Sequence, residues 1–125
     1  FVLPLESSKE GLIEILNQIR INNKGSFLAV LKKFGKQDGL ISFPLEGYTL
    51  ALDFPVTRSL FKFLNTLDEI VLNYGGRLYL TKDARMAPEL FWNTYPHAKK
   101  FQETIKKYNP DSLFSSLQSK RLKIT

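Results

Sequence analysis

The stretch YTLALDF, residues 48–54, predicts a β-strand with two unlike faces. Successive side chains of a strand point to opposite sides of the sheet. We expect the bulky residues to meet helices, and these are Tyr48, Leu50, Leu52 and Phe54. We expect the small and polar residues to line an open face, and these are Thr49, Ala51 and Asp53. Pro55 ends the strand, because proline cannot donate to the ladder.

The flanking segments alternate between strand and helix patterns. Residues 1–5 and 26–34 are apolar and favour strands. A helix to about Asn22 is predicted between them from apolar residues at helical spacing after a capping-box pattern at Ser7 and Glu10. A second helix is predicted by an apolar stripe over 60–74, with Thr57 able to cap it and Gly75 as its left-handed stop.

With a last strand over 77–80, the order is strand-helix-strand-strand-helix-strand. It predicts an α+β, ferredoxin-like domain over residues 1–82, with an antiparallel four-stranded sheet and both helices on one face. C-terminal helices are expected over residues 83–125, beginning near Pro88, His97 and Asn109. Their aromatic residues exceed what one small sheet needs, so we expect them to pack on something outside this chain; they are Phe91, Trp92, Phe101 and Phe114.

The stretch GGRLYLTKDAR, residues 75–85, carries the candidate site. Because side chains alternate along a strand, Arg77 and Tyr79 are expected on the open face, where a ligand or another domain could dock. Lys82 leaves the sheet near them and could hold an anion or stabilise negative charge developing on a bound cofactor. Residues 79 and 82 can share a site only if the strand ends or bulges near Thr81. A solvated strand-to-helix loop is the alternative interpretation.

Composition narrows the classes of function. The 125 residues suit one domain, and the absence of Cys together with a single His, His97, excludes thiolate and His-rich metal sites and a Cys nucleophile. No apolar run reaches the roughly 18 residues of a membrane span. The net charge of +6 is concentrated in residues 98–125, which hold 7 basic and 2 acidic groups. Such a tail suits nucleic acid, an anionic surface or a solvated helix face.

A set of short motifs runs through the chain. They are Ile41-Ser42-Phe43-Pro44, Gly47-Tyr48, Leu52-Asp53-Phe54-Pro55, Gly75-Gly76-Arg77-Leu78-Tyr79, Lys82-Asp83-Ala84-Arg85, Tyr95-Pro96, and Asn109-Pro110-Asp111 with Phe114. Together they resemble the C-terminal part of FAD-linked oxidases of the vanillyl-alcohol oxidase superfamily. Among these, the oxidases that act on a polyprenyl-phosphoryl pentose in cell-wall precursor synthesis are the most similar.

The resemblance implies a substrate-binding (cap) domain of a longer FAD-dependent oxidoreductase that oxidises a sugar hydroxyl. FAD would be bound mainly by an N-terminal domain that this sequence lacks, and residues 83–125 would pack back on that domain. The chain alone is then expected to be inactive. The expected partners are a sugar or sugar-lipid substrate, the FAD-binding domain and a reductase, in the cytoplasm or at the periphery of the inner membrane. No metal and no nucleic acid are expected.

The resemblance also assigns roles to residues. It implies that Lys82 is the catalytic lysine at the flavin and substrate, and that Tyr79 is its neighbour at the flavin. Lys32 corresponds to a pocket lysine, and the loop over residues 35–39 would lie at the substrate entrance. Ala51 stands where the actinobacterial oxidases have a cysteine, so thiol-directed capture is not expected here. The substrate-binding set is Lys32, Thr49, Ala51, Asp53 and Arg77.

Two other functions fit the same predicted fold. An RNA-binding module would use aromatic residues on the open face, but Tyr79 is the only one there and Asp53 is its neighbour. Salt-sensitive binding of single-stranded RNA would support this function. A regulatory or dimerising module is the other alternative, and changes in melting or sedimentation on adding a ligand would favour it.

Overall fold

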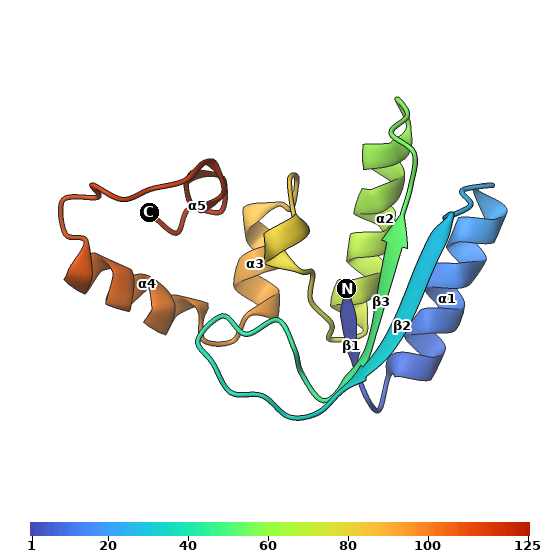
Figure 1. Ribbon diagram of the computed structural model, residues 1–125, viewed down its shortest axis with the longest axis horizontal. Coiled ribbons are helices and arrows are strands. Elements are labelled where there is room, and N and C mark those ends of the chain that lie inside the picture. The colour runs from blue at the N-terminus through green and yellow to red at the C-terminus, as the bar shows by residue number, and fades with distance from the viewer.

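The fold is α+β, as expected, in a computed structural model that describes all 125 residues (Figure 1). Three antiparallel strands form the sheet in the order β1 (Val2–Pro4), β3 (Gly47–Asp53), β2 (Leu28–Phe34). Helices α1 (Ser8–Ile21) and α2 (Leu60–Asn73) follow β1 and β3. The C-terminal part holds the 3₁₀ turn η1 (Leu80–Lys82) and the helices α3 (Pro88–Thr94), α4 (Ala98–Tyr108) and α5 (Leu117–Arg121).

The first core lies between the sheet and the two long helices. Both helices cover the same face of the sheet, as Figure 1 shows. The buried residues of this core are Leu3, Ile15, Leu60, Phe63, Leu67, Ile70 and Val71. From the alternating stretch, Leu50 is buried and Phe54 packs against this core, whereas Ala51 and Asp53 are exposed. The alternation therefore assigned the two faces of β3 correctly.

Thr49 departs from that assignment in its exposure. It lies on the face away from the helices, next to the fully buried Val2, and it is itself buried. Its hydroxyl donates a hydrogen bond of 2.7 Å to the carbonyl oxygen of Phe1. The expectation that Thr49 lines an open surface is therefore wrong, because its polar atom is used inside the chain.

The expected fourth strand is reduced to one residue. Arg77 exchanges two backbone hydrogen bonds of 3.0 Å with Val2, and then the chain leaves the sheet. Side chains take the carbonyls that a longer strand would offer to a neighbour: the Tyr95 hydroxyl donates to Leu78 and the Gln118 amide donates to Leu80. The prediction of a strand over 77–80 is wrong beyond Arg77, and the three-stranded sheet does not complete the ferredoxin-like pattern.

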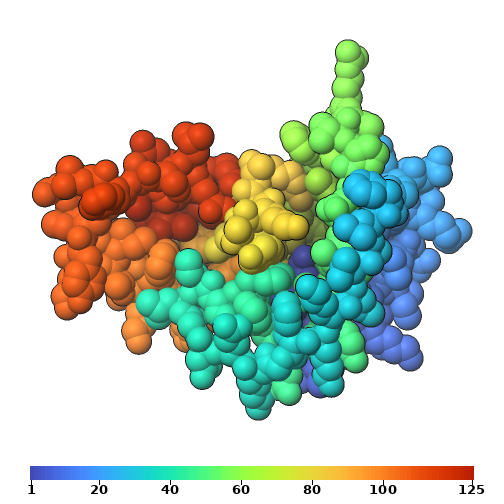
Figure 2. Space-filling model, viewed as in Figure 1, coloured from blue at the N-terminus to red at the C-terminus, as the bar shows by residue number.

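A second core holds the C-terminal helices beyond the β1 edge of the sheet (Figure 1). Its buried residues are Met86, Leu90, Phe91, Tyr95, Ala98, Leu122 and Ile124. Trp92 and Phe101 pack against it, so the expectation that these aromatics need a surface outside the chain is wrong for all but Phe114, which is 80% exposed. In the space-filling view the segment after β2 lies along the lower front of the molecule, below the residues around η1 (Figure 2).

The ends of the helices agree only in part with the start and stop signals in the sequence. Gly75 ends α2 with φ of +71°, as predicted. Ser7 precedes α1, but its hydroxyl donates to the carbonyl of Tyr74 (2.7 Å) and ties the start of α1 to the end of α2 instead of capping. The last helix begins at Leu117 rather than near Asn109, whose side chain bonds the backbone of Phe114 twice. No helix in the structure combines the length and apolar character that crossing a bilayer would require.

Close contact between β1 and β3 gives the first prediction. A Cβ at Gly47 would stand 1.9 Å from the carbonyl oxygen of Leu3, and backbone cannot yield as a side chain can. Gly47→Ala should lower the free energy of unfolding by about 3 kcal/mol, measured by urea denaturation of the protein. Gly25→Ala is the matched control, because a Cβ there meets nothing within 4 Å. Equal stability of the two variants would contradict the close packing.

Candidate functional site

The strand register gathers the predicted sheet residues on one face. Directly opposed residues of antiparallel strands have side chains on the same side. Thr49 lies opposite both Val2 and Lys32, and Val2 lies opposite Arg77. We call this surface, opposite α1 and α2, the site face. It carries Lys32, Thr49, Ala51, Asp53 and Arg77.

Only part of the site face is free to meet a ligand. Lys32, Ala51 and Asp53 are exposed. Arg77 is half-buried: its Nη1 donates to the carbonyl of Ser42 (2.8 Å) and its guanidinium carbon lies 5.3 Å from the ring centroid of Tyr95. Burial lowers the pKa of Arg77. In this chain Arg77 therefore connects the sheet with the segment after β2 and with Tyr95, the residue that follows α3.

The turn η1 brings Tyr79 and Lys82 together. The strand ends well before Thr81. Because side chains alternate along a strand, Tyr79 and Lys82 could share a site only if the strand ended there. The amide of Lys82 donates to the carbonyl of Tyr79 (3.3 Å), and in a turn closed this way side chains three residues apart lie on the same side. Tyr79 is 41% exposed, and the Lys82 ammonium is exposed and makes no hydrogen bond or ion pair in the chain. The turn thus presents a phenol and a free cation.

An aromatic row joins this turn to the sheet. The ring of Phe43 lies 4.8 Å from that of Tyr79 and 6.0 Å from that of Phe34 at the end of β2. Phe43 comes from the segment after the glycine-bounded loop over 35–39, which is exposed. Phe43 therefore forms a wall beside Tyr79.

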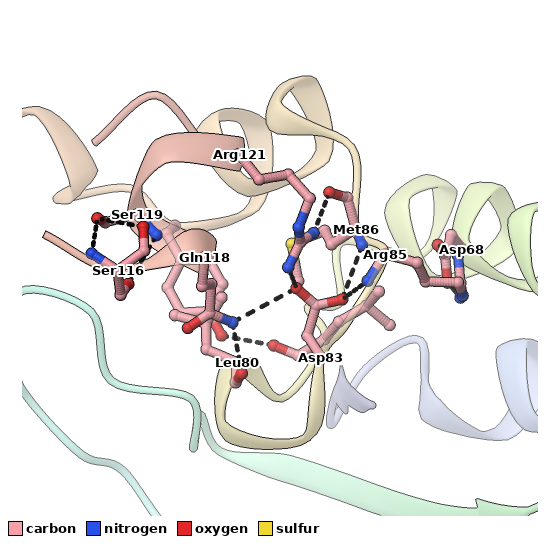
Figure 3. A network of polar contacts seen from close by, with 11 residues as sticks. Asp68, Leu80, Asp83, Arg85, Met86, Ser116, Gln118, Ser119 and Arg121 are labelled. Atoms are coloured by element: carbon pink, nitrogen blue, oxygen red, sulfur yellow. Dashed lines mark hydrogen bonds and ion pairs between the residues drawn. The ribbon is translucent and has the colours of Figure 1, made fainter. Parts of the chain in front are cut away.

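The residue after Lys82 is the centre of a polar cluster that the sequence did not reveal (Figure 3). The Asp83 side chain is only 5% exposed. One carboxylate oxygen accepts from the backbone amides of Arg85 (2.9 Å) and Met86 (2.7 Å). The other accepts from Nη2 of Arg121 (2.7 Å) and, at 3.4 Å, from the amide of Gln118. These five residues are the Asp83 cluster, and they join η1 to α5.

Hydrogen bonds decide the charge state of this buried acid. Burial alone raises the pKa of Asp83, but the bonds from Arg121 and from the two backbone amides outweigh it, so that the pKa is lower than usual. The carboxylate is therefore held in its charged form.

A second ion pair fastens the same segment to α2. The guanidinium of Arg85 meets the carboxylate of Asp68 through two bonds, of 2.7 and 2.8 Å, and also donates to Asn65 (2.9 Å). Burial raises the pKa of Asp68, and Arg85 offsets this in part. Three of the four residues Lys82-Asp83-Ala84-Arg85 are charged, and two of these charges are structural.

Two hollows of the molecule lie away from these residues. One of about 460 Å³ lies between α4 and residues 109–119, and one of about 350 Å³ lies between α2 and α3. Neither is lined by Lys32, Tyr79 or Lys82. The candidate site, an open face beside an exposed turn, therefore lies outside both of these hollows.

Fold and site together describe an α+β segment that offers one sheet face and one lysine-bearing turn to a ligand or to another domain. No protein-family model matches the chain. It is 36% identical over 125 residues to decaprenylphosphoryl-beta-D-ribose oxidase of Mycolicibacterium smegmatis, covering 99% of this chain and 27% of that protein. It is also 39% identical over 95 residues to an uncharacterized protein in the mprA 5' region of Streptomyces coelicolor, covering 74% of this chain and 26% of that protein.

The chain therefore spans about a quarter of the length of the curated relatives it matches. The resemblance to part of an oxidase of this kind, expected from the motifs, is confirmed.

The low pKa of Asp83 predicts a pH dependence of stability. A carboxylate with a depressed folded pKa contributes stability above its unfolded pKa of about 3.9, and the contribution is lost as pH falls through the folded value. Asp83→Asn should lower the free energy of unfolding by about 2 kcal/mol at pH 6, and the difference from the parent should shrink towards pH 2. Urea denaturation across this range tests it, with Asp111→Asn as an exposed control. A difference that is the same at both ends would contradict the charged cluster.

Proposed function

We propose that this chain is the substrate-binding (cap) part of an FAD-dependent oxidoreductase that oxidises a sugar hydroxyl, with a polyprenyl-phosphoryl pentose or a related sugar as substrate. The similarity along 99% of the chain to a protein named as a decaprenylphosphoryl ribose oxidase carries the proposal. The exposed Tyr79 and Lys82 on one turn, beside an open sheet face, support it.

The donors at η1 suit the edge of a flavin. The Lys82 ammonium has no partner in the chain and the Tyr79 ring has one open side, so both can meet a planar group placed against the turn. FAD, held mainly by a further domain, would supply a two-electron acceptor for hydride from the sugar carbinol. Lys82 would stabilise negative charge at the cofactor or orient the sugar hydroxyl. Tyr79 and Phe43 would form the wall that orients the ring.

The substrate would lie along the exposed part of the site face. Lys32 offers a cation suited to the phosphoryl group, and Asp53 offers an acceptor for sugar hydroxyls. Ala51, two residues before Asp53 on β3, leaves room and supplies no thiol. Thr49 and Arg77 would support this surface from within the chain, since the Thr49 hydroxyl and Nη1 of Arg77 already donate to backbone carbonyls.

The C-terminal segment would complete the protein by packing on the FAD-binding domain. Its exposed apolar side chains are Tyr108, Leu113, Phe114 and Leu117, all at least 75% exposed. Large apolar side chains left this exposed are suited to an interface. The chain alone would then be inactive, and a lipid-linked substrate would place the whole protein at the periphery of the inner membrane, with a reductase as electron acceptor.

Removing the Lys82 ammonium tests the catalytic role. In the full-length protein, Lys82→Ala should slow flavin reduction by sugar about 10²–10³-fold, because one charge-stabilising donor is lost. Anaerobic stopped-flow absorbance measures the rate, and Lys99→Ala on the exposed side of α4 is the control. Near-normal reduction in Lys82→Ala would remove this residue from the mechanism.

Neighbouring lysines on β2 separate the two sheet faces. Lys32 is opposite Thr49 on the site face, whereas Lys33 is opposite Tyr48 and points the other way. Lys32→Ala should raise the KM for the sugar substrate about 10-fold, the loss expected for one charged hydrogen bond. Lys33→Ala should leave KM unchanged. Equal effects of the two substitutions would show that the substrate does not lie on this face.

A further inference from the structure

The turn η1 is weakly held by its own backbone. Its internal bonds run from the amide of Lys82 to Tyr79 (3.3 Å) and from the amide of Asp83 to Leu80 (3.2 Å). Both lie at the long limit for amide hydrogen bonds. A turn of three residues with such bonds does not by itself fix a side chain at its end.

Side chains of helix α5 supply strong hydrogen bonds to both ends of the turn. Gln118 donates to the carbonyl of Leu80 at 2.6 Å, at the start of η1, and Arg121 binds Asp83 at 2.7 Å, just after its end. The second guanidinium nitrogen of Arg121 donates to the carbonyl of Met86 (2.6 Å). Charge-assisted bonds of this length are about twice as strong as neutral ones. Both ends of the turn are therefore attached to one helix, 35 to 38 residues further along the chain.

Helix α5 is itself firmly placed. Ser116 and Ser119 form a reciprocal capping box at its start. Leu122 and Ile124, directly after it, are buried in the second core, and the indole of Trp92 donates to the carbonyl of Leu122 (2.9 Å). The attachment of η1 therefore leads into a packed core and not to a mobile tail.

We propose that Asp83 is a positioning residue, which fastens the turn carrying Tyr79 and Lys82 to α5 and so sets where the Lys82 ammonium stands. The inference rests on the proposed function, because only there does Lys82 act on a substrate. Misplacement of a reacting group by about 1 Å can cost about 100-fold in rate. Even a displacement of Lys82 smaller than this would then reduce turnover while leaving the site face intact.

The pair between Arg85 and Asp68 provides a matched comparison. Like the pair between Arg121 and Asp83, it is mostly buried and close in sequence to Lys82, but it is bidentate and ties the chain to α2 after the turn has ended. Loss of stability should be similar for Asp68→Asn and Asp83→Asn. Loss of position at Lys82 should follow only from Asp83→Asn.

The experiment uses the full-length flavoprotein with either substitution. For Asp83→Asn we expect flavin reduction at saturating sugar to fall about 10-fold or more, with KM and bound FAD unchanged. Amide hydrogen exchange in residues 79–86, followed by mass spectrometry, should rise at least about 10-fold. For Asp68→Asn we expect a parent-like rate of reduction and parent-like exchange in residues 79–82. Gln118→Ala removes the hydrogen bond to the Leu80 carbonyl and no buried charge. It should show the same pattern as Asp83→Asn in milder form, and it replaces that variant if Asp83→Asn does not fold.

The outcomes separate the two proposals. Reduction within about twofold of the parent in Asp83→Asn, or an equal loss in Asp68→Asn, would overturn the positioning role. If the parent protein binds no flavin, the proposed function fails. Hydrogen exchange then still decides this inference: a rise in residues 79–82 confined to Asp83→Asn and Gln118→Ala supports the attachment to α5, and unchanged exchange overturns it.

Discussion

The buried carboxylate of Asp83 is the constraint on which the attachment of η1 to the C-terminal helices depends. A charge removed from water is costly unless donors surround it, and Asp83 meets four donors from its own turn and from α5. The segment around it is also tied to α2 through Arg85 and Asp68. The first core belongs to the sheet and the second to the C-terminal helices. The pair of Arg85 and Asp68 joins them, together with Leu78, which packs against both cores.

The same segment explains why the sheet stops at three strands. A fourth strand beside β1 would need the carbonyls and amides of residues 77–80 for the ladder. The hydroxyl of Tyr95 and the amide of Gln118 occupy the carbonyls of Leu78 and Leu80 instead. Burial raises the pKa of Tyr95, so its hydroxyl remains a donor across the ordinary pH range. In place of a fourth edge strand, the chain forms a turn that presents Tyr79 and Lys82.

Sequence patterns correctly predicted the features that neighbouring residues determine. Alternation in residues 48–54 gave the two faces of β3, and a glycine with positive φ ends α2 as expected. The parity argument also identified where the strand must end. Contacts between distant residues left no such signal: Asp83 and Arg121 are 38 residues apart, and Asp68 and Arg85 are 17 apart. The charge-rich run after the strand indicated a site, but nothing in it showed that only Lys82 is free.

Helix α5 connects the candidate site to the surface that would meet the rest of the protein. Gln118 and Arg121 reach inward to η1, while Leu117, one residue earlier, is 89% exposed. An apolar side chain so exposed is stabilised when another surface covers it. In the proposed oxidoreductase the covering domain would be the one that holds FAD, so its contact with Leu117 would act on the helix that positions Lys82.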